Sequence, residues 1–217
     1  MTLNALWRAL PVAAAILAVA PAALAADTPS AKATTATLAA VPAVTAADRV
    51  LGRADAPVTV IEYASFTCSH CAHWNNEVFP AFKARFIDTG KVRLVFRDLP
   101  TDPQQYSMAA ALIGRCAAPG KFFDVAKSLF AGQAALATGG GRAWFDNAIV
   151  ASGRTQAEIE ACFDEPAKQQ ALTADIDAAI AAGVNSTPTF FVNGRPFSGD
   201  PTVEALSVAI TAAAPAR

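Results

Sequence analysis

The four residues Cys68-Ser69-His70-Cys71 constrain this chain more than any other stretch. They follow the apolar run Val58–Phe66 and open a segment with helical spacing. Two cysteines three residues apart at the start of a helix lie on the same turn, so they can form a disulfide with little backbone movement. The first thiol lies where unpaired N–H groups and the positive end of the helix dipole meet, which favours the thiolate. We therefore predict a redox-active dithiol, because the thiolate is the species that attacks a disulfide.

Two other roles are open for these cysteines. Cys68 and Cys71 could form a purely structural disulfide, or they could hold zinc together with His70 and His73. A zinc site needs about four ligands arranged tetrahedrally around the ion. These four side chains lie within one and a half turns of a single helix, so they cannot surround one ion. We expect no metal and no cofactor, and we expect His73 to be an ordinary exposed helix residue.

The N-terminal segment predicts export. Arg8 precedes a short apolar run that ends at Ala23-Leu24-Ala25. A positive start, an apolar core and a small-residue cleavage site describe a secretory signal peptide, which we assign to residues 1–25. An uncleaved membrane anchor is the alternative, although the uncharged run is barely long enough to span a bilayer and two prolines interrupt it. We therefore expect the mature protein to be exported from the cytosol.

Residues 26–48 are rich in Ala, Thr and Pro and contain almost no large apolar side chains. Such a segment cannot bury enough surface to order itself, so we predict a disordered linker. The whole chain of 217 residues is 53% hydrophobic and 16% charged, which suits one globular domain with or without an insertion. Its formal net charge is -1 and it has no basic run, so we expect no nucleic-acid partner.

Around the dithiol the pattern is strand, helix, strand. Val58–Tyr63 is a nearly continuous apolar run of the kind found in strands that are buried on both faces of a sheet. A helix is predicted over Cys68–Ile87, with a kink at Pro80, where a helical hydrogen bond is lost. Lys91–Arg97 alternates apolar and polar residues and is the next predicted strand. A short return of this kind predicts a right-handed βαβ unit with parallel strands.

The remainder is first helical and then returns to strands. Residues 100–183 carry helical periodicity, which predicts an all-helical insertion. Thr189–Val192 then has strand character, and Asn193-Gly194 is a strong hairpin turn signal ahead of a second strand and a last helix. We therefore expect an α/β domain that is formed by residues 49–99 and 184–217 and is interrupted by the insertion.

Two further cysteines, Cys116 and Cys162, lie in different predicted helices of the insertion. In an oxidising compartment disulfides form and persist, and an even number of cysteines fits one catalytic pair and one structural pair. We predict a structural disulfide that closes a loop of about 45 residues. The alternative is two buried thiols that never meet.

These features together resemble the DsbA-type periplasmic thiol-disulfide oxidoreductases, which have a thioredoxin fold with a helical insertion. The resemblance rests on a Cys-x-x-Cys opening a helix after a strand, on the helical block, on Thr187-Pro188 ahead of a hairpin, and on the export signal. It covers the chain from about Arg49 to the C-terminus. In one position the chain departs from the pattern, because the family commonly has Pro where this chain has Ser69.

The resemblance also assigns roles to residues. Cys68 corresponds to the attacking cysteine and Cys71 to the resolving one. His70 occupies the place of the motif histidine, where a positive charge would stabilise the Cys68 thiolate; an exposed histidine without consequence is the alternative. Glu62 matches a buried acidic residue, for which we expect a raised pKa and proton exchange with Cys71. The alternative for Glu62 is a strand residue that reaches solvent.

Thr187-Pro188 matches the family loop that faces the dithiol, whose proline is cis. The backbone beside this loop could pair with an extended substrate chain. A trans proline that merely ends a loop is the alternative, since the sequence alone does not determine the isomer.

The function that we expect is a monomeric dithiol oxidase that introduces disulfides into unfolded or folding secreted polypeptides. By resemblance, a membrane reoxidase of the DsbB kind would return the Cys68–Cys71 pair to the disulfide. Two alternatives stay open. One is a disulfide reductase or isomerase with the same fold, and the other is a metal-binding or peptide-binding module without turnover.

Overall fold

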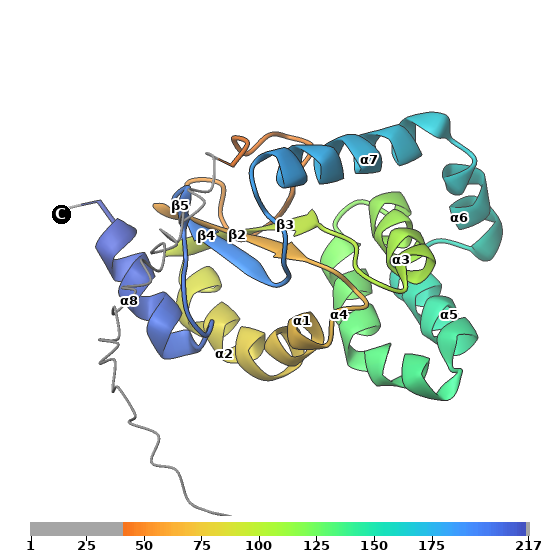
Figure 1. Cartoon of the computed structure of the whole chain (residues 1–217), viewed down its shortest axis with the longest axis horizontal. Coiled ribbons are helices and arrows are strands. Elements are labelled where there is room, and N and C mark those ends of the chain that lie inside the picture. Colours follow the sequence, from red (N-terminus) through yellow and green to blue (C-terminus); the bar gives the residue numbers. More distant parts are fainter. Residues whose placement is uncertain (1–40, 216–217) are drawn as a thin grey trace, which may run out of the picture. The chain divides into compact units, whose positions relative to one another are not determined.

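A five-stranded sheet with the strand order β1-β3-β2-β4-β5 is central to the computed structural model, which describes residues 41–215 (Figure 1). The strands are β1 (Arg49–Leu51), β2 (Val58–Ala64), β3 (Val92–Asp98), β4 (Thr189–Val192) and β5 (Arg195–Pro196). β2 and β3 run parallel, and the other three neighbouring pairs run antiparallel. The parallel pair confirms the predicted βαβ unit.

β2 is the strand that leads into the dithiol. Every residue of β2 is buried except Thr59, which is half-buried, as expected for an apolar strand with neighbours on both sides. Glu62, the fifth of its seven residues, lies in register with Phe96 of β3 and Phe190 of β4. The strand pairing therefore holds the carboxyl group of Glu62 inside the protein.

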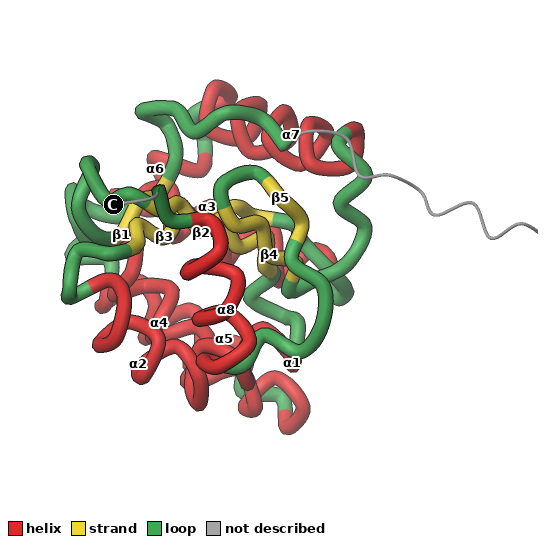
Figure 2. The backbone as a smooth tube through the Cα atoms, turned by 90° about the vertical axis from the view of Figure 1, so that its left-hand side faces the viewer, coloured by secondary structure: helices red, strands yellow, loops and turns green. Residues whose placement is uncertain are grey.

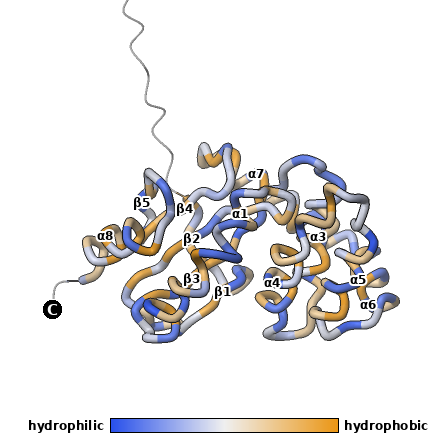
Figure 3. The backbone as a smooth tube through the Cα atoms, turned by 90° about the horizontal axis from the view of Figure 1, so that it is seen from below, coloured by the Kyte–Doolittle hydropathy of each residue, from blue (hydrophilic) through white to orange (hydrophobic). Residues whose placement is uncertain are grey.

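Helices cover both faces of the sheet. Figures 1 and 2 show α7 (Pro166–Ala181) on one side, and α8 (Val203–Ala213) with the helical segment that follows the dithiol on the other. The core on the α8 side includes Val58, Val60, Trp74, Phe82, Phe86, Leu94, Phe190, Leu206 and Ile210. The core on the α7 side includes Ile61, Tyr63, Val95, Leu99, Ala179, Val184 and Phe191. Hydrophobic stretches along the strands and on the helices packed against them are visible in Figure 3.

The segment after the dithiol is helical as predicted, but its geometry changes along its length. It consists of α1 (Ser69–His73), a π-helical segment (Trp74–Val78), α2 (Phe79–Phe82) and a second π-helical segment (Lys83–Ile87). Pro80 has no N–H to donate, and just before it the N–H of Phe79 donates to the carbonyl of Trp74, five residues back. The disturbance predicted at Pro80 therefore takes the form of a π-helical turn.

Between β3 and β4 the chain is helical, where the insertion was predicted. The elements are α3 (Gln104–Cys116), α4 (Phe122–Gly132), a 3-10 helix (Gln133–Thr138), α5 (Gly141–Ala151), α6 (Gln156–Phe163) and α7. Their shared core contains Leu129, Phe130, Trp144 and Leu172 and extends to Phe66 beside the dithiol. The predicted fold class, α/β with inserted helices, is confirmed. That residues 100–183 form a domain of their own stays a prediction.

A buried ion pair fastens α3 to β3. The Nε and Nη2 atoms of Arg115 donate to the Oδ2 atom of Asp98 over 3.0 and 2.8 Å. Both side chains are at most 5% exposed, so this pair is shielded from solvent. Arg115 also donates to Asp175 of α7 over 2.9 Å, and in this way one guanidinium connects β3 with two helices of the insertion.

Residues 41–48 belong to the segment that was predicted as a disordered linker, 26–48, yet they have a defined conformation. The guanidinium of Arg97 donates to the carboxylate of Asp48 over 2.9 and 3.1 Å and to two backbone carbonyls of this segment. The structure thus differs from the linker prediction over residues 41–48. The reason is that one arginine of β3 supplies contacts that the composition of the segment does not reveal.

The predicted signal peptide, residues 1–25, lies outside the described residues, as does the rest of the predicted linker, residues 26–40. Within residues 41–215, none of the helices combines the length and the hydrophobicity that crossing a bilayer requires. Export to the periplasm stays a prediction from the sequence.

Candidate active site

The dithiol lies at the junction of β2 and α1. Cys68 is the N-cap residue of α1, with an extended backbone (φ −79°, ψ 118°), and Cys71 lies one turn further on. The N–H of Cys71 donates to the Sγ atom of Cys68 over 3.4 Å. Both are free thiols in this structure, with Cys68 half-buried and Cys71 fully buried. The geometry is therefore that of the reduced dithiol.

Hydrogen bonds around the Cys68 sulfur lower the pKa of this thiol from 9.0 to about 5. The largest contribution is a hydrogen bond with the Cys71 side chain, and a hydrogen bond with the Thr187 side chain and the backbone N–H groups of Cys71 and His70 add to it. Partial burial acts in the opposite direction. The backbone groups are the unpaired donors at the start of α1, and they act in the direction expected of a helix N-terminus. At neutral pH Cys68 is a thiolate.

Cys71 has the opposite character. Burial raises the pKa of the Cys71 thiol, and its hydrogen bond to Cys68 and the nearby carboxyl group of Glu62 act in the same direction. Cys71 therefore keeps its proton when Cys68 has lost its own. Two thiols of such different acidity are suited to two different steps of an exchange reaction.

Glu62 is completely buried near the dithiol, which excludes the alternative of a strand residue that reaches solvent. Burial raises the pKa of this carboxyl group to about 8, and the Cys68 thiolate raises it further, while a hydrogen bond from Asn75 acts against the shift. Its Oε2 atom has no hydrogen-bond partner among the described residues. A charged carboxylate in this position would be costly, so Glu62 is protonated at neutral pH.

Asn75 connects Glu62 to the active-site helix, and the sequence reasoning missed it. Its Nδ2 atom donates to the Oε1 atom of Glu62 over 3.2 Å and to the carbonyl oxygen of Cys71 over 3.1 Å. The available signal was the spacing, because Asn75 follows Cys71 by four residues and so lies on the same face of the helix.

The imidazole of His70 is exposed, and the described residues give it no hydrogen-bond partner. The backbone N–H of His70, rather than its ring, is the group that contributes to the lowered pKa of Cys68. A role for the imidazole charge therefore stays a prediction. Ser69 and His73 are likewise exposed, as was expected for His73.

The loop at Thr187-Pro188 faces the dithiol. Its peptide bond is cis, which the resemblance implied and the sequence could not determine. In the thiol form, the Sγ–H group of Cys68 donates to the carbonyl oxygen of Thr187 over 3.3 Å. A backbone acceptor from the C-terminal half of the fold thus lies directly beside the reactive sulfur.

Two further contacts hold the loop between β2 and α1, and neither was predicted. The Nε2 atom of Gln133 donates to the carbonyl oxygens of Phe66 and Cys68 over 2.8 and 2.9 Å. The hydroxyl oxygen of Ser65 accepts from the N–H and the hydroxyl group of Thr101 over 3.1 and 2.9 Å. Pairings between residues so far apart in the sequence leave no periodic signal in either segment.

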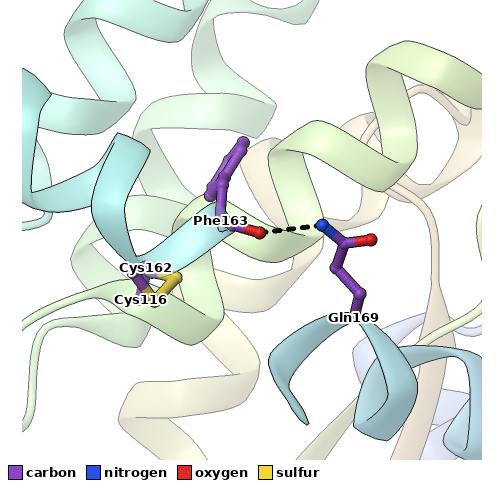
Figure 4. Close-up of a disulfide and its surroundings, with 4 residues drawn as sticks. All are labelled: Cys116, Cys162, Phe163 and Gln169. Atoms are coloured by element: carbon purple, nitrogen blue, oxygen red, sulfur yellow. Dashed lines mark hydrogen bonds between the residues drawn. A yellow bond between two sulfur atoms is a disulfide. The ribbon is translucent and has the colours of Figure 1, made fainter. Parts of the chain in front are cut away.

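The disulfide between Cys116 of α3 and Cys162 of α6 is present, as predicted (Figure 4). The two Cα atoms are 6.0 Å apart, and the cysteines are separated by 46 positions in the sequence. Beside it, the Nε2 atom of Gln169 donates to the carbonyl oxygen of Phe163 over 2.8 Å (Figure 4). The alternative of two free thiols is wrong.

No group of three or more His, Cys, Asp or Glu side chains within residues 41–215 is arranged to hold a metal ion. The candidates considered for zinc separate in the fold, because Cys71 is buried while His70 and His73 are exposed.

A groove of about 420 Å³ adjoins the active-site helix. Ser69 and Ala72 of α1 line one side, and Gln133 and Leu136 of the 3-10 helix line the other. A larger cavity of about 690 Å³ includes Asn75 in its lining but neither cysteine of the dithiol. Neither cysteine lines the groove itself, but Thr67 and Ser69, the two sequence neighbours of Cys68, both do.

Known proteins of similar sequence and structure include thiol-disulfide oxidoreductases. Residues 44–212 match the family model described as Thioredoxin. The crystal structure of alpha-DsbA1 from Wolbachia pipientis superimposes with a TM-score of 0.69 and 26% sequence identity, covering 79% of this chain and 92% of that one. A Rickettsia bellii protein named "Putative protein-disulfide oxidoreductase" is 29% identical over 150 residues, which are 68% of this chain and 57% of that protein.

A second kind of relative is much longer. The "Na(+)/H(+) antiporter NhaA 3" of Salinispora tropica is 34% identical over 171 residues, which are 76% of this chain and 24% of the antiporter. The chain thus spans about a quarter of the antiporter and little more than half of the Rickettsia protein.

Proposed function

We propose that this chain, which belongs to the thioredoxin family and has a DsbA-type structural relative, is a thiol-disulfide oxidoreductase that oxidises dithiols of exported polypeptides. The observation that carries the proposal is the difference in acidity between two thiols on one helical turn. The pKa of Cys68 is lowered to about 5, and that of Cys71 is raised. Stabilising the thiolate stabilises the reduced protein, and this makes the Cys68–Cys71 disulfide a better oxidant.

The reaction begins with the oxidised protein. A thiolate of the substrate attacks the Sγ atom of Cys68, the Cys68–Cys71 bond breaks, and a mixed disulfide between the substrate and Cys68 forms. Cys71 leaves as a thiolate and takes up a proton. A second thiolate of the substrate then attacks the substrate sulfur of the mixed disulfide, and Cys68 leaves as a thiolate. Two electrons have passed from the substrate dithiol to the cysteine pair.

We assign to Glu62 the exchange of a proton with Cys71. Its carboxyl group is protonated at neutral pH because its pKa is raised to about 8. It can therefore supply a proton when Cys71 becomes a buried thiolate, and take one back when the disulfide is formed again. Asn75, which bonds both to the Glu62 carboxyl group and to the Cys71 carbonyl, supports this assignment because it holds the two residues together.

The difference in pKa between the two thiols also explains the direction of the second step. A thiol with a low pKa is a good leaving group, so Cys68 is readily released from the mixed disulfide once a second substrate thiolate arrives. Attack by Cys71 on the mixed disulfide, which would return the substrate to its reduced form, is slow because the Cys71 thiol keeps its proton.

Two surfaces beside the dithiol suit a polypeptide. The Thr187 carbonyl lies next to the Cys68 sulfur on a loop that continues into β4, where an extended chain can hydrogen-bond to the backbone. The groove between α1 and the 3-10 helix can accept apolar side chains that flank the substrate cysteine. We further propose that the protein works in the periplasm and that a membrane reoxidase of the DsbB kind regenerates the disulfide.

The reduction potential of the Cys68–Cys71 couple, measured by equilibration with glutathione, tests this function. We expect a potential near or above that of the glutathione pool, together with oxidation of a reduced, unfolded test protein. A potential close to that of thioredoxin would contradict the oxidase proposal and favour a reductase. A Cys68→Ser variant is the matched control, because it keeps Cys71 and the fold but cannot form the couple.

A further inference from the structure

The side chain of Gln133, in the helical insertion, binds the backbone of the loop that carries Cys68. Its Nε2 atom donates to the carbonyl oxygen of Phe66 over 2.8 Å and to that of Cys68 over 2.9 Å. A side-chain amide has two N–H donors, so both donors of Gln133 are used on the loop that carries the reactive cysteine. The donor comes from a residue 65 positions away from Cys68 in the sequence.

These two hydrogen bonds determine the orientation of the backbone on either side of the reactive cysteine. The Cys68 carbonyl also accepts from the N–H of Ala72 over 3.0 Å, so it takes part in starting α1. The orientation of this carbonyl sets the extended ψ of 118° at Cys68. In this conformation the Sγ atom turns back over the helix N-terminus and accepts from the N–H of Cys71.

The loop is held by side-chain packing from the same part of the chain. The ring of Phe66 lies 5.0 Å from that of Phe130 in α4 and is stacked at 5.3 Å on Phe96 of β3. Gln133 directly follows α4. The same part of the chain therefore packs against the Phe66 ring and donates a hydrogen bond to the Phe66 carbonyl oxygen. Because Gln133 is itself half-buried, water competes poorly for these carbonyls.

We propose that Gln133 is a positioning residue for Cys68. It holds the loop in the conformation in which the helix N-terminus stabilises the Cys68 thiolate, and in this way the helical insertion sets part of the acidity of the dithiol. The proposal extends the proposed function, because the acidity of Cys68 decides how strongly the protein oxidises its substrates.

The decisive substitution is Gln133→Met, which keeps the length and shape of the side chain and removes both donors. We expect the pKa of Cys68 to rise by roughly half a unit to one unit. In the reduced protein at pH 5, the rate of alkylation of Cys68 then falls about two- to fivefold. At neutral pH, equilibration with glutathione shifts about three- to tenfold toward the oxidised protein, because the reduced form has lost part of its stabilisation.

Gln169→Met is the matched control. Gln169 also donates from its side chain to a backbone carbonyl, that of Phe163, over 2.8 Å, but it lies beside the Cys116–Cys162 disulfide (Figure 4). Gln169 is exposed and makes one such bond, so we expect this variant to lose less thermal stability than Gln133→Met while the pKa of Cys68 stays unchanged. If Gln133→Met loses stability and the pKa and the glutathione equilibrium stay as in the parent protein, Gln133 is only structural and the proposal is wrong.

Gln133→Asn keeps the test decisive if the methionine variant does not fold. The shorter side chain retains the amide but cannot reach both carbonyls, so we expect a smaller rise in the pKa of Cys68. An unchanged pKa in this variant would equally overturn the proposal. Alkylation needs no substrate protein, so it still tests Gln133 if the parent protein fails to oxidise dithiols and the proposed function is abandoned.

Discussion

The sulfur of Cys68 lies 3.3 Å from the carbonyl oxygen of Thr187, although 119 positions separate the two residues in the sequence. This contact joins the two halves of the thioredoxin-like fold at the point of reaction. One side of the sulfur faces the start of α1, which stabilises its negative charge, and the other side faces a backbone group that an extended substrate would approach.

Alkylation of the reduced protein should distinguish the two thiols of the motif. Because the pKa of Cys68 is lowered to about 5, its modification rate should follow a titration with a midpoint near that pH. Cys71 is buried and its pKa is raised, so it should react only after unfolding. Mass spectrometry of the modified protein across a pH series measures both. A midpoint near pH 9, the ordinary value for cysteine, would contradict the thiolate assignment.

The Cys71 thiol should contribute more to the acidity of Cys68 than the His70 ring does. The hydrogen bond with Cys71 is the largest of the effects that lower the pKa of Cys68, whereas only the backbone of His70 takes part. We expect Cys71→Ala to raise the pKa of Cys68 clearly and His70→Ala to raise it less. Thiolate absorbance in the ultraviolet, followed against pH, measures each value. A larger effect from His70→Ala would show that the imidazole charge is the main source of the acidity.

The stability of the reduced protein should depend on pH through two groups with opposite signs. A raised carboxyl pKa, as in Glu62, gives a contribution that is present below the unfolded value of 4.5 and is lost as the pH rises through about 8. A lowered thiol pKa, as in Cys68, gives a contribution that is present above the unfolded value of 9.0 and is lost as the pH falls through about 5. Between about pH 5 and 8 the two effects offset each other.

Single substitutions should therefore reveal how each group alone makes the free energy of unfolding depend on pH. In reduced Cys68→Ser, the free energy of unfolding should fall as the pH rises from 4.5 to 8, because Glu62 remains. In reduced Glu62→Gln, it should rise over the interval from pH 5 to 9, and at neutral pH this variant should be more stable than the parent by on the order of 3 kcal/mol. Denaturant titrations at several pH values measure these slopes. Parallel curves for the two variants would refute the assignment.

Removal of the structural disulfide should cost stability and leave the dithiol intact. The bond closes a loop of 46 positions, for which chain entropy predicts a loss of about 4 kcal/mol in the double variant Cys116→Ser/Cys162→Ser. Urea denaturation of the oxidised forms measures the difference. The alkylation rate of Cys68 should stay as in the parent protein. A change in that rate would mean that the disulfide acts on the active site as well.

The ion pair between Arg115 and Asp98 should be costly to break from one side. Asp98→Ala leaves a guanidinium that is 5% exposed without its main partner, so we expect a loss of about 3 kcal/mol in unfolding free energy. Replacing both residues, in Asp98→Leu/Arg115→Met, should restore much of this loss because no buried charge remains. Thermal unfolding of the three proteins decides the matter. A double variant that is less stable than the single one would show that the pair itself stabilises the fold.

Local patterns allowed much of the fold to be predicted from the sequence. The strand before the dithiol, the helix after it and the Asn193-Gly194 hairpin each depend on neighbours in the chain, and all three are present. The Cys116–Cys162 pairing could be predicted because only two cysteines were left for it. By contrast, the order of residues 41–48 depends on Arg97, which lies about fifty positions further along the chain.

In the candidate site, too, some residues could be predicted from local sequence patterns and others only from the folded structure. Cys68 and Cys71 carry their signal in their spacing, and Glu62 is conspicuous as an acid within an apolar strand. Asn75 and Gln133 are ordinary amide residues in helical segments, and apart from the four-residue spacing between Cys71 and Asn75 the sequence around them does not mark them. Their roles come from hydrogen bonds to groups that only the folded chain brings near. Residues that hold a reactive group in place are therefore harder to predict than those that react.

Both outer strands of the sheet are short. β1 has three residues, and β5 has two, one of which is Pro196 and has no N–H to offer. A long open strand can pair through its backbone with an unfolded chain, and under the proposed function the protein would meet such chains repeatedly. Because both outer strands are this short, a polypeptide that reacted at the dithiol under the proposed function would find little unpaired backbone on which to assemble.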